Sequence, residues 1–155
     1  MTRSSIVLRL AAVAGVAIVA LGTTALLRAP APAAPTITVY KSASCGCCGK
    51  WIEHLRAAGF TVQAFDTEDL VSVATSMGVP FRLTSCHTAR VGNYAIEGHV
   101  PADLIKKLLA EHPALAGLAV PGMVTGSPGM EGPGAQSYDV IAWNRDGKTT
   151  IYARR

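Results

Sequence analysis

The sequence predicts an α/β domain with the element order β-α-β-α-β-β-α, followed by a loop and a C-terminal β-hairpin. Two observations predict it. Short β-branched or aromatic runs alternate with segments of helical periodicity over residues 36–111. Three cysteines lie at the turn between the first strand-like run and the first helix-like segment. About 120 residues remain after the N-terminal segment is set aside, which suits one compact domain.

The first half of the domain supplies two strand-helix pairs. Residues 36–40 (TITVY) are a β-branched run typical of a buried strand. A helix is expected from near Cys48 to Gly59, because apolar residues recur at helical spacing and glycine commonly ends a helix. Residues 60–65 predict a second strand. Residues 68–77 predict a second helix, with the Asp-Thr pair before it as the cap.

The second half supplies two hairpins around a third helix. Residues 86–91 and 94–97 flank a Gly-Asn pair, which favours a tight hairpin turn. Pro101 opens an amphipathic helix. Residues 117–137 are rich in Gly and Pro and are expected to form a loop, and residues 138–152 a hairpin. This order, with cysteines at the first strand-helix turn, is thioredoxin-like.

Residues 1–33 have the three-part pattern of a secretory signal. Arg3 and Arg9 precede an apolar stretch at 10–27, and a small-residue site would allow cleavage after Ala33. The stretch is also close to the length that spans a bilayer, so an uncleaved anchor in the inner membrane is the alternative. Either way we expect residues 34–155 to be exported to the periplasm, with membrane contact only if the segment is uncleaved.

The charge of the chain argues against a nucleic-acid partner. The full chain carries 14 basic and 10 acidic residues. Three of the arginines and none of the acidic residues fall within residues 1–33, so the remaining domain is almost neutral. It shows no cluster of Lys and Arg of the kind that binds phosphate backbones.

Four cysteines carry the candidate chemistry: Cys45, Cys47, Cys48 and Cys86. The CxxC pair Cys45 and Cys48 at a helix start favours thiolate, which is both a redox nucleophile and a metal ligand. One alternative is two structural disulfides, although closing very short loops constrains the unfolded chain least. A second is a thiol-disulfide oxidoreductase. Cys47 is not needed by a simple dithiol, whereas a metal site would use it, so metal binding is favoured.

The donor set favours copper, as Cu(I). Soft thiolates bind Cu(I), zinc or iron-sulfur centres, but three ligands within one turn would strain a single tetrahedral zinc site. Imidazoles can join the site if their strands approach the cysteine turn. The His87 ring is a candidate ligand, although strand alternation points it away from Cys86, and His99 is a weaker candidate.

Two methionines and two further histidines lie outside the cysteine cluster in the sequence. The repeated Pro-Gly-Met places the thioethers of Met123 and Met130 on a loop that can fold over a copper site, while filling gaps beneath a loop is the alternative role. His54 and His112 are interpreted as solvated helix positions.

Four blocks of the sequence resemble one family: VYKSASCGCCGKW (39–51), GVP (78–80), SCHTARVGNYAIEGHVP (85–101) and AVPGMVTGSPGM (119–130). They are similar to the CopG-like copper-resistance proteins, which are distinct from the DNA-binding repressors of the same name. The resemblance runs from about Val39 to Tyr152. It implies a thioredoxin-like fold, a role in periplasmic copper resistance, and copper held by the four cysteines, with His87, Met123 and Met130 as further candidates.

The sequence therefore predicts an exported copper-binding protein that holds Cu(I) through a cysteine cluster, with copper ions and other periplasmic copper-handling proteins as partners. The alternative is an enzyme, either a thiol-disulfide oxidoreductase or a Cu(I) oxidoreductase, that uses the Cys45/Cys48 dithiol. Storage, transfer and redox cycling of copper all remain open at this point.

Overall fold

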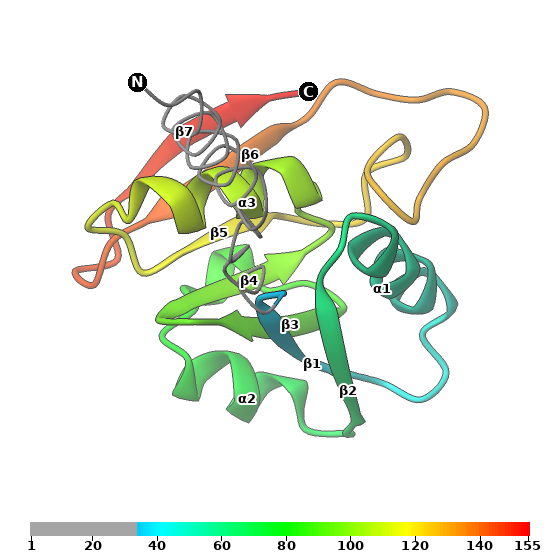
Figure 1. Ribbon diagram of the computed structural model, residues 1–155, viewed down its shortest axis with the longest axis horizontal. Helices are drawn as coiled ribbons and strands as arrows, with labels where there is room; N and C mark the ends of the chain where they lie inside the picture. Colours follow the sequence, from blue (N-terminus) through cyan, green and yellow to red (C-terminus); the bar gives the residue numbers. More distant parts are fainter. Residues whose placement is uncertain (1–33) are drawn as a thin grey trace, which may run out of the picture. The chain divides into compact units, whose positions relative to one another are not determined.

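A seven-stranded mixed sheet organises the domain in the computed structural model, which describes residues 34–155 (Figure 1). The strands lie in the order β2-β1-β3-β4-β5-β6-β7. The elements are β1 (Thr36–Lys41), α1 (Gly46–Ala57), β2 (Thr61–Asp66), α2 (Leu70–Ser76), the 3₁₀ turn η2 (Phe81–Leu83), β3 (His87–Val91), β4 (Tyr94–Gly98), α3 (Ala102–Glu111), β5 (Gly117–Val120), β6 (Asp139–Trp143) and β7 (Thr149–Arg154).

The first four strands and three helices have the predicted β-α-β-α-β-β-α order. Strand β1 pairs in parallel with β2 and antiparallel with β3, and β3 forms an antiparallel hairpin with β4. The α/β, thioredoxin-like prediction is therefore confirmed, including the hairpin about Gly92 and Asn93. The C-terminal hairpin, β6 with β7, is also present and extends the same sheet.

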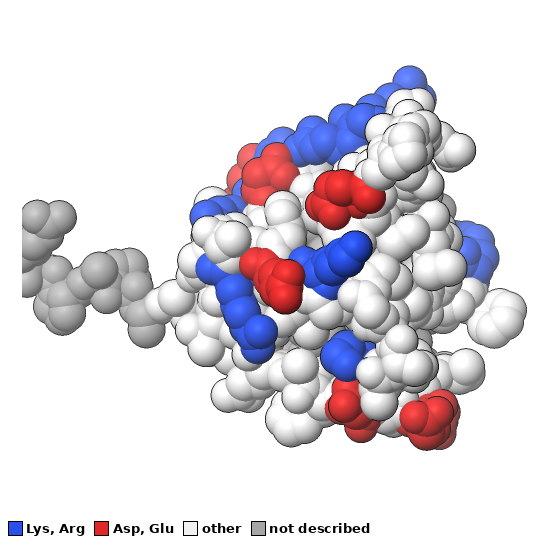
Figure 2. Space-filling model, turned by 90° about the vertical axis from the view of Figure 1, so that its right-hand side faces the viewer, with Lys and Arg blue, Asp and Glu red and all other residues white. Residues whose placement is uncertain are grey.

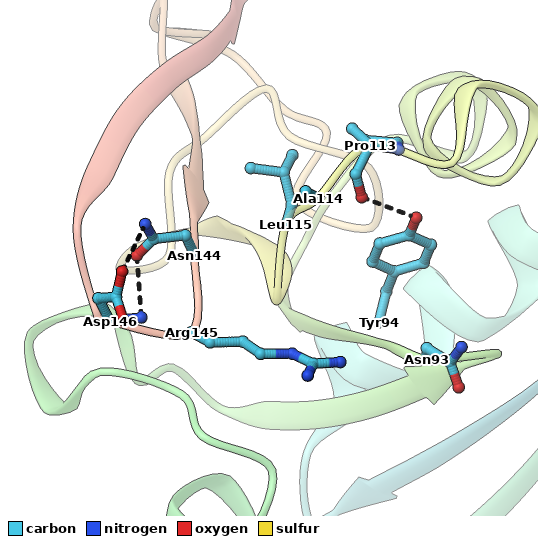
Figure 3. Close-up of a pocket in the computed structure, with 8 residues that line it drawn as sticks. All are labelled: Asn93, Tyr94, Pro113, Ala114, Leu115, Asn144, Arg145 and Asp146. Carbon is cyan, nitrogen blue, oxygen red and sulfur yellow. Dashed lines mark hydrogen bonds between the residues drawn. The ribbon is translucent and has the colours of Figure 1, made fainter.

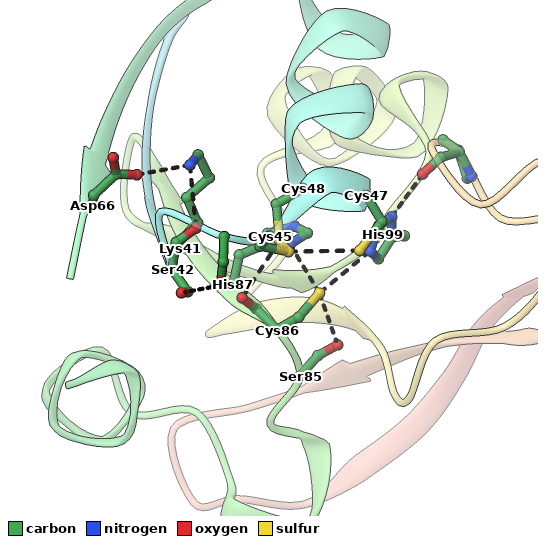
Figure 4. The surroundings of a disulfide bond; sticks show 12 residues. Lys41, Ser42, Cys45, Cys47, Cys48, Asp66, Ser85, Cys86, His87 and His99 are labelled. Carbon is green, nitrogen blue, oxygen red and sulfur yellow. Dashed lines mark hydrogen bonds and ion pairs between the residues drawn. A yellow bond between two sulfur atoms is a disulfide. The ribbon is translucent and has the colours of Figure 1, made fainter. Parts of the chain in front are cut away.

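The two faces of the sheet are covered by different elements. Side chains alternate across β4 and β5, so that Ile96 and Leu118 pack in one core with apolar residues of α1 and α3. Their neighbours Ala95 and Ala119 pack on the opposite face in a smaller core with residues of α2, η2 and β6. The end of β1, the start of β3 and the N-terminus of α1 consequently meet at one edge of the larger core, where the cysteines lie (Figure 4).

Helix α1 begins at Gly46, two residues before Cys48, as the sequence predicts. Two other predicted boundaries are wrong. Helix α2 spans only Leu70–Ser76 because Asp69, rather than Asp66 or Thr67, accepts the capping hydrogen bond from the Ser72 N–H. The expected loop at 117–137 begins with a fully buried strand, β5. Gly117 is required there, since a Cβ would collide with the Ala95 carbonyl and the Trp143 ring.

The predicted signal or anchor, residues 1–33, lies outside the described residues. Within residues 34–155 no helix has both the length and the apolar character needed to span a bilayer. On the face of the molecule in Figure 2, acidic groups lie close to basic ones. Ion pairs in the domain include Arg155 with Asp103 and Arg154 with Asp139, the latter at 3.2 Å.

Candidate metal centre

The N-terminus of α1 presents three cysteines in one turn. The chain leaves β1, turns at Ser42–Ser44 and enters the helix through Cys45, whose extended backbone makes it the N-cap. Cys45 and Cys48 are joined by a disulfide with a Cα–Cα distance of 5.4 Å (Figure 4). Cys47 is free, and its Sγ lies 3.6 Å from the Sγ of Cys45. The CxxC pair is therefore oxidised, with a third, free thiol beside it.

Cys86 approaches this turn from the segment that precedes β3. Its carbonyl oxygen lies 3.5 Å from the Sγ of Cys48, and its own thiol is free. The sulfur atoms of all four cysteines lie within 4.8 Å of one another. The sequence prediction that Cys86 completes the cysteine cluster is thus matched by the geometry, and the alternative of two structural disulfides is not what the structure contains.

Two buried imidazoles flank the Cys86 thiol. Its Sγ lies 3.4 Å from Nδ1 of His87 and 3.4 Å from Nε2 of His99. Both histidines are fully buried, and the His87 ring packs against Trp51 with 4.3 Å between ring centroids. Cys86, His87 and His99 therefore form a second set of donor atoms, also within 4.8 Å, that shares its sulfur with the cysteine cluster.

The tautomer of His99 follows from its second contact. Its Nδ1 lies 2.8 Å from the carbonyl oxygen of Pro128, which can only accept a hydrogen bond. Nδ1 must therefore carry the proton, and in the neutral ring Nε2 presents its lone pair to Cys86. Such an arrangement orients an imidazole for metal binding.

Burial keeps this region uncharged in the absence of metal. Removal from water raises the pKa of the Cys86 thiol to about 11, and the nearby Cys47 adds to the effect. The same removal from water, reinforced by His99, lowers the pKa of His87 to about 3. Nε2 of His87 is also buried without a hydrogen-bond partner. The thiol is thus protonated and His87 neutral at pH 7, and a bound cation would reverse the preference of Cys86 by favouring thiolate.

Glu97 holds the Cys86 segment in place. This carboxylate is almost fully buried and accepts hydrogen bonds from the Ser85 N–H and, at 2.7 Å, from the Thr88 hydroxyl. Desolvation raises its pKa to about 7 against the opposing effect of both hydrogen bonds. Sequence inspection did not select Glu97, and its position opposite Thr88 on the β3–β4 hairpin is the signal that could have found it.

The loop after β5 forms a wall next to the cluster. Gly129 has φ of +84° and lies against the backbone of α1, where an added Cβ would come within 2.7 Å of the Trp51 nitrogen and 2.9 Å of the Cys47 oxygen. Met130 follows directly and is half-buried. An open groove of about 460 Å³ lies there, lined by Gly46, Cys47, Lys50, Thr125, Gly129, Met130 and Glu131.

The two methionines of the repeated motif have different surroundings. Met130 lines the groove that contains Cys47, whereas Met123 is 61% exposed. Their predicted role as copper ligands stays a prediction. Another cavity, of about 430 Å³, lies near Tyr94 and Arg145 (Figure 3) and contains no sulfur donor.

Three histidines lie in surroundings that differ from those expected. His87 does not point away from Cys86, because Cys86 precedes the start of β3 and strand alternation does not apply to it. His99 is as close to the thiol as His87 is. His54 is half-buried, and its Nε2 accepts a hydrogen bond from the Ala102 N–H at 3.1 Å, whereas His112 is exposed as expected.

Comparisons with known proteins identify the family of this chain. Residues 83–130 match a family model described as "Protein of unknown function, DUF411". Two solved structures, "Copper resistance protein copG- Form 2" and "Copper resistance protein copG- Form 1", are each 42% identical to this chain with a TM-score of 0.75. Each match covers 79% of this chain and 98% of the other. No curated protein sequence matches the chain significantly. Identity of this extent over almost the whole of both solved chains shows that the protein belongs to the CopG family of copper resistance proteins.

Proposed function

We propose that this protein is an exported copper-binding protein that holds Cu(I) through its cysteine cluster and acts in copper resistance. The observation that carries the proposal is the convergence of all four cysteine sulfurs within 4.8 Å. Thiolate sulfur is a soft ligand that selects Cu(I), and closely spaced cysteines can bridge more than one ion. The imidazoles of His87 and His99 supply two further donors at the inner side of the cluster.

The state of the Cys45–Cys48 pair determines whether the site can form. A disulfide sulfur is a poor ligand, so a reducing dithiol must first supply two electrons and two protons, breaking this S–S bond to give two thiols while it becomes a disulfide itself. Cu(I) then displaces the thiol protons as it binds, because only deprotonated cysteine coordinates the metal. Reduction and copper loading are therefore coupled in the proposed function.

Two sources outside the site support the biological context. The solved relatives carry the words "copper resistance protein" in their titles. The pattern of residues 1–33 favours export to the periplasm, where other copper-handling proteins would donate or accept the metal.

Anaerobic copper titration is the direct test. The reduced protein is titrated with Cu(I) against a chromogenic chelator, and bound copper per chain and its oxidation state are measured. We expect tight uptake, with lower stoichiometry in Cys47→Ser and in Cys86→Ser. His112→Ala, which changes an exposed histidine, is the matched control and should bind as the wild type does. Wild-type protein that takes up no Cu(I), or Cys45→Ser/Cys48→Ser protein that retains all of it, would contradict the proposal.

A redox enzyme is the second candidate, favoured by the observed disulfide between Cys45 and Cys48 at the start of a helix. In a thiol-disulfide oxidoreductase these two residues alone would carry turnover. Sustained reduction of a disulfide substrate without metal, lost in Cys45→Ser and unchanged in Cys86→Ser, would identify that activity. Turnover that requires copper and also fails in Cys86→Ser would identify a Cu(I) oxidoreductase.

A further inference from the structure

We infer that the groove beside Cys47 is the entrance through which Cu(I) reaches the cluster, with the Met130 thioether as a transient ligand that hands the ion to Cys47. The inference rests on the proposed function. It adds a route for Cu(I) through the groove and assigns a role to Met130, which the final site does not require. In this proposal the Met130 thioether binds the ion transiently, and the four cysteine sulfurs bind it in the final site.

Burial within the cluster determines where an ion can enter. Cys48 and the imidazoles of His87 and His99 are fully buried, so they face the inner side of the site. Cys47 is only half-buried, and it is a free thiol that lines the groove. Because the remaining sulfurs lie within 4.8 Å of Cys47, an ion bound there is already within reach of the whole cluster.

Met130 has the chemistry of a transfer ligand. A thioether is a soft donor that suits Cu(I), and it is neutral, so it binds without releasing a proton. In the step proposed, the bond from copper to the Met130 sulfur breaks as the bond to the Cys47 sulfur forms, and the thiol proton passes to water. The copper stays Cu(I) throughout, so no electron is exchanged.

The backbone fixes Met130 at this position. Hydrogen bonds run from the Gly126 N–H to the Met130 oxygen at 2.9 Å and from the Met130 N–H to the Ser127 oxygen at 2.8 Å. The loop is joined to the cluster through the Pro128 carbonyl, which accepts from His99, and it lies on α1 at Gly129. Met130 is therefore held at the groove by the same loop that orients His99.

Charged groups at the rim have opposite signs. The Glu131 carboxylate accepts a hydrogen bond from the Gly129 N–H at 2.8 Å, and the Lys50 side chain lines the same groove. The groove therefore carries no net negative charge of the kind that concentrates hydrated divalent cations. Selection at the entrance then depends on the sulfur atoms, which favours a soft monovalent ion.

Stopped-flow uptake of Cu(I) separates a transfer ligand from a ligand of the final site. Reduced protein is mixed with the Cu(I) acetonitrile complex, and the copper-thiolate absorbance is followed with time. Met130→Leu removes the sulfur while conserving volume, and Met123→Leu is the matched control at an exposed position. Chelator competition gives the stoichiometry and affinity of each variant at equilibrium.

We expect Met130→Leu to slow uptake by about tenfold with stoichiometry and affinity unchanged, and Met123→Leu to behave as the wild type. Equal uptake rates in wild type and Met130→Leu would overturn the entrance role. Lower stoichiometry or affinity in Met130→Leu would also overturn it, since Met130 would then be a ligand of the final site. A wild-type protein that takes up no Cu(I) at all would instead contradict the proposed function. Met130→Ala, with equilibrium unfolding measured alongside, checks that a slow rate comes from the missing sulfur and not from a misfolded loop.

Discussion

Replacing Gly129 with alanine should detach the loop wall from α1, and Gly134→Ala provides a matched control. Both glycines lie in the loop after β5 with positive φ, +84° and +78°. At Gly134 an added Cβ meets nothing within 4 Å, so only the backbone conformation is penalised, by about 1–2 kcal/mol. At Gly129 the Cβ would also come within 2.7 Å and 2.9 Å of backbone atoms of Trp51 and Cys47.

The additional cost at Gly129 follows from those two contacts. Backbone atoms cannot rotate aside, so the loop must retreat by roughly 0.7 Å to restore ordinary van der Waals distance. Overpacking of this kind costs about 1–3 kcal/mol, which brings the expected loss for Gly129→Ala to about 2–5 kcal/mol. For a domain of this size each kcal/mol lowers Tm by roughly 3–6 °C.

Equilibrium denaturant unfolding of the two variants measures the difference, and alkylation of Cys47 in metal-free protein gives a second readout. We expect Gly129→Ala to be less stable than Gly134→Ala and its Cys47 to react faster, because the wall beside the thiol has moved. Equal stability of the two variants would refute the close packing of the loop on α1.

Three further predictions concern pH and use metal-free protein. Alkylation of Cys86, followed by peptide mass mapping, should rise with pH towards a midpoint near 11, since burial raises the pKa of this thiol to about 11; a midpoint near 9 would contradict its desolvation. The pKa of His87 is lowered from 6.5 to about 3, so this residue contributes stability that is present above pH 6.5 and lost as pH falls. In urea unfolding between pH 6.5 and about pH 4, the free energy of unfolding of the wild type should therefore fall by about 3 kcal/mol relative to that of His87→Phe. The pKa of Glu97 is raised from 4.5 to about 7, so this residue contributes stability that is present below pH 4.5 and lost as pH rises. Between pH 4.5 and 7 the free energy of unfolding of Glu97→Gln should therefore rise by up to about 3 kcal/mol relative to that of the wild type. Parallel stability curves for the two proteins would refute the burial of Glu97 as a titrating group.

The order of the elements could be predicted because each has a local signal. The β-branched run before the cysteines, the Gly-Asn turn and the Pro101 helix start are all read from adjacent residues. Strand β5 carried no such signal, because its four buried residues begin with glycine and lead directly into a segment rich in Gly and Pro. Its strand conformation depends on tertiary contacts: β5 pairs with β4 on one side and β6 on the other, and the Trp143 ring lies against Gly117.

The cysteines of the site could be predicted from the sequence, but the arrangement of the imidazoles could not. The expectation for His87 assumed that Cys86 belongs to the strand, whereas the strand begins one residue later. His99 owes its place to Gly98, whose φ of +66° turns the chain at the end of β4 and whose Cβ would collide with the Val120 carbonyl. A glycine directly before a histidine at a strand end is the local signal that was available.

The contact between His99 and Pro128 has a consequence for how the protein tolerates change. The acceptor is a main-chain oxygen, so no replacement of the side chain at position 128 deletes it. Insertion or deletion of residues between β5 and β6 would displace that oxygen, and the imidazole would then be free to rotate or exchange its tautomer. The spacing of this loop, more than the identity of its residues at that point, is therefore what keeps the histidine lone pair directed at the sulfur.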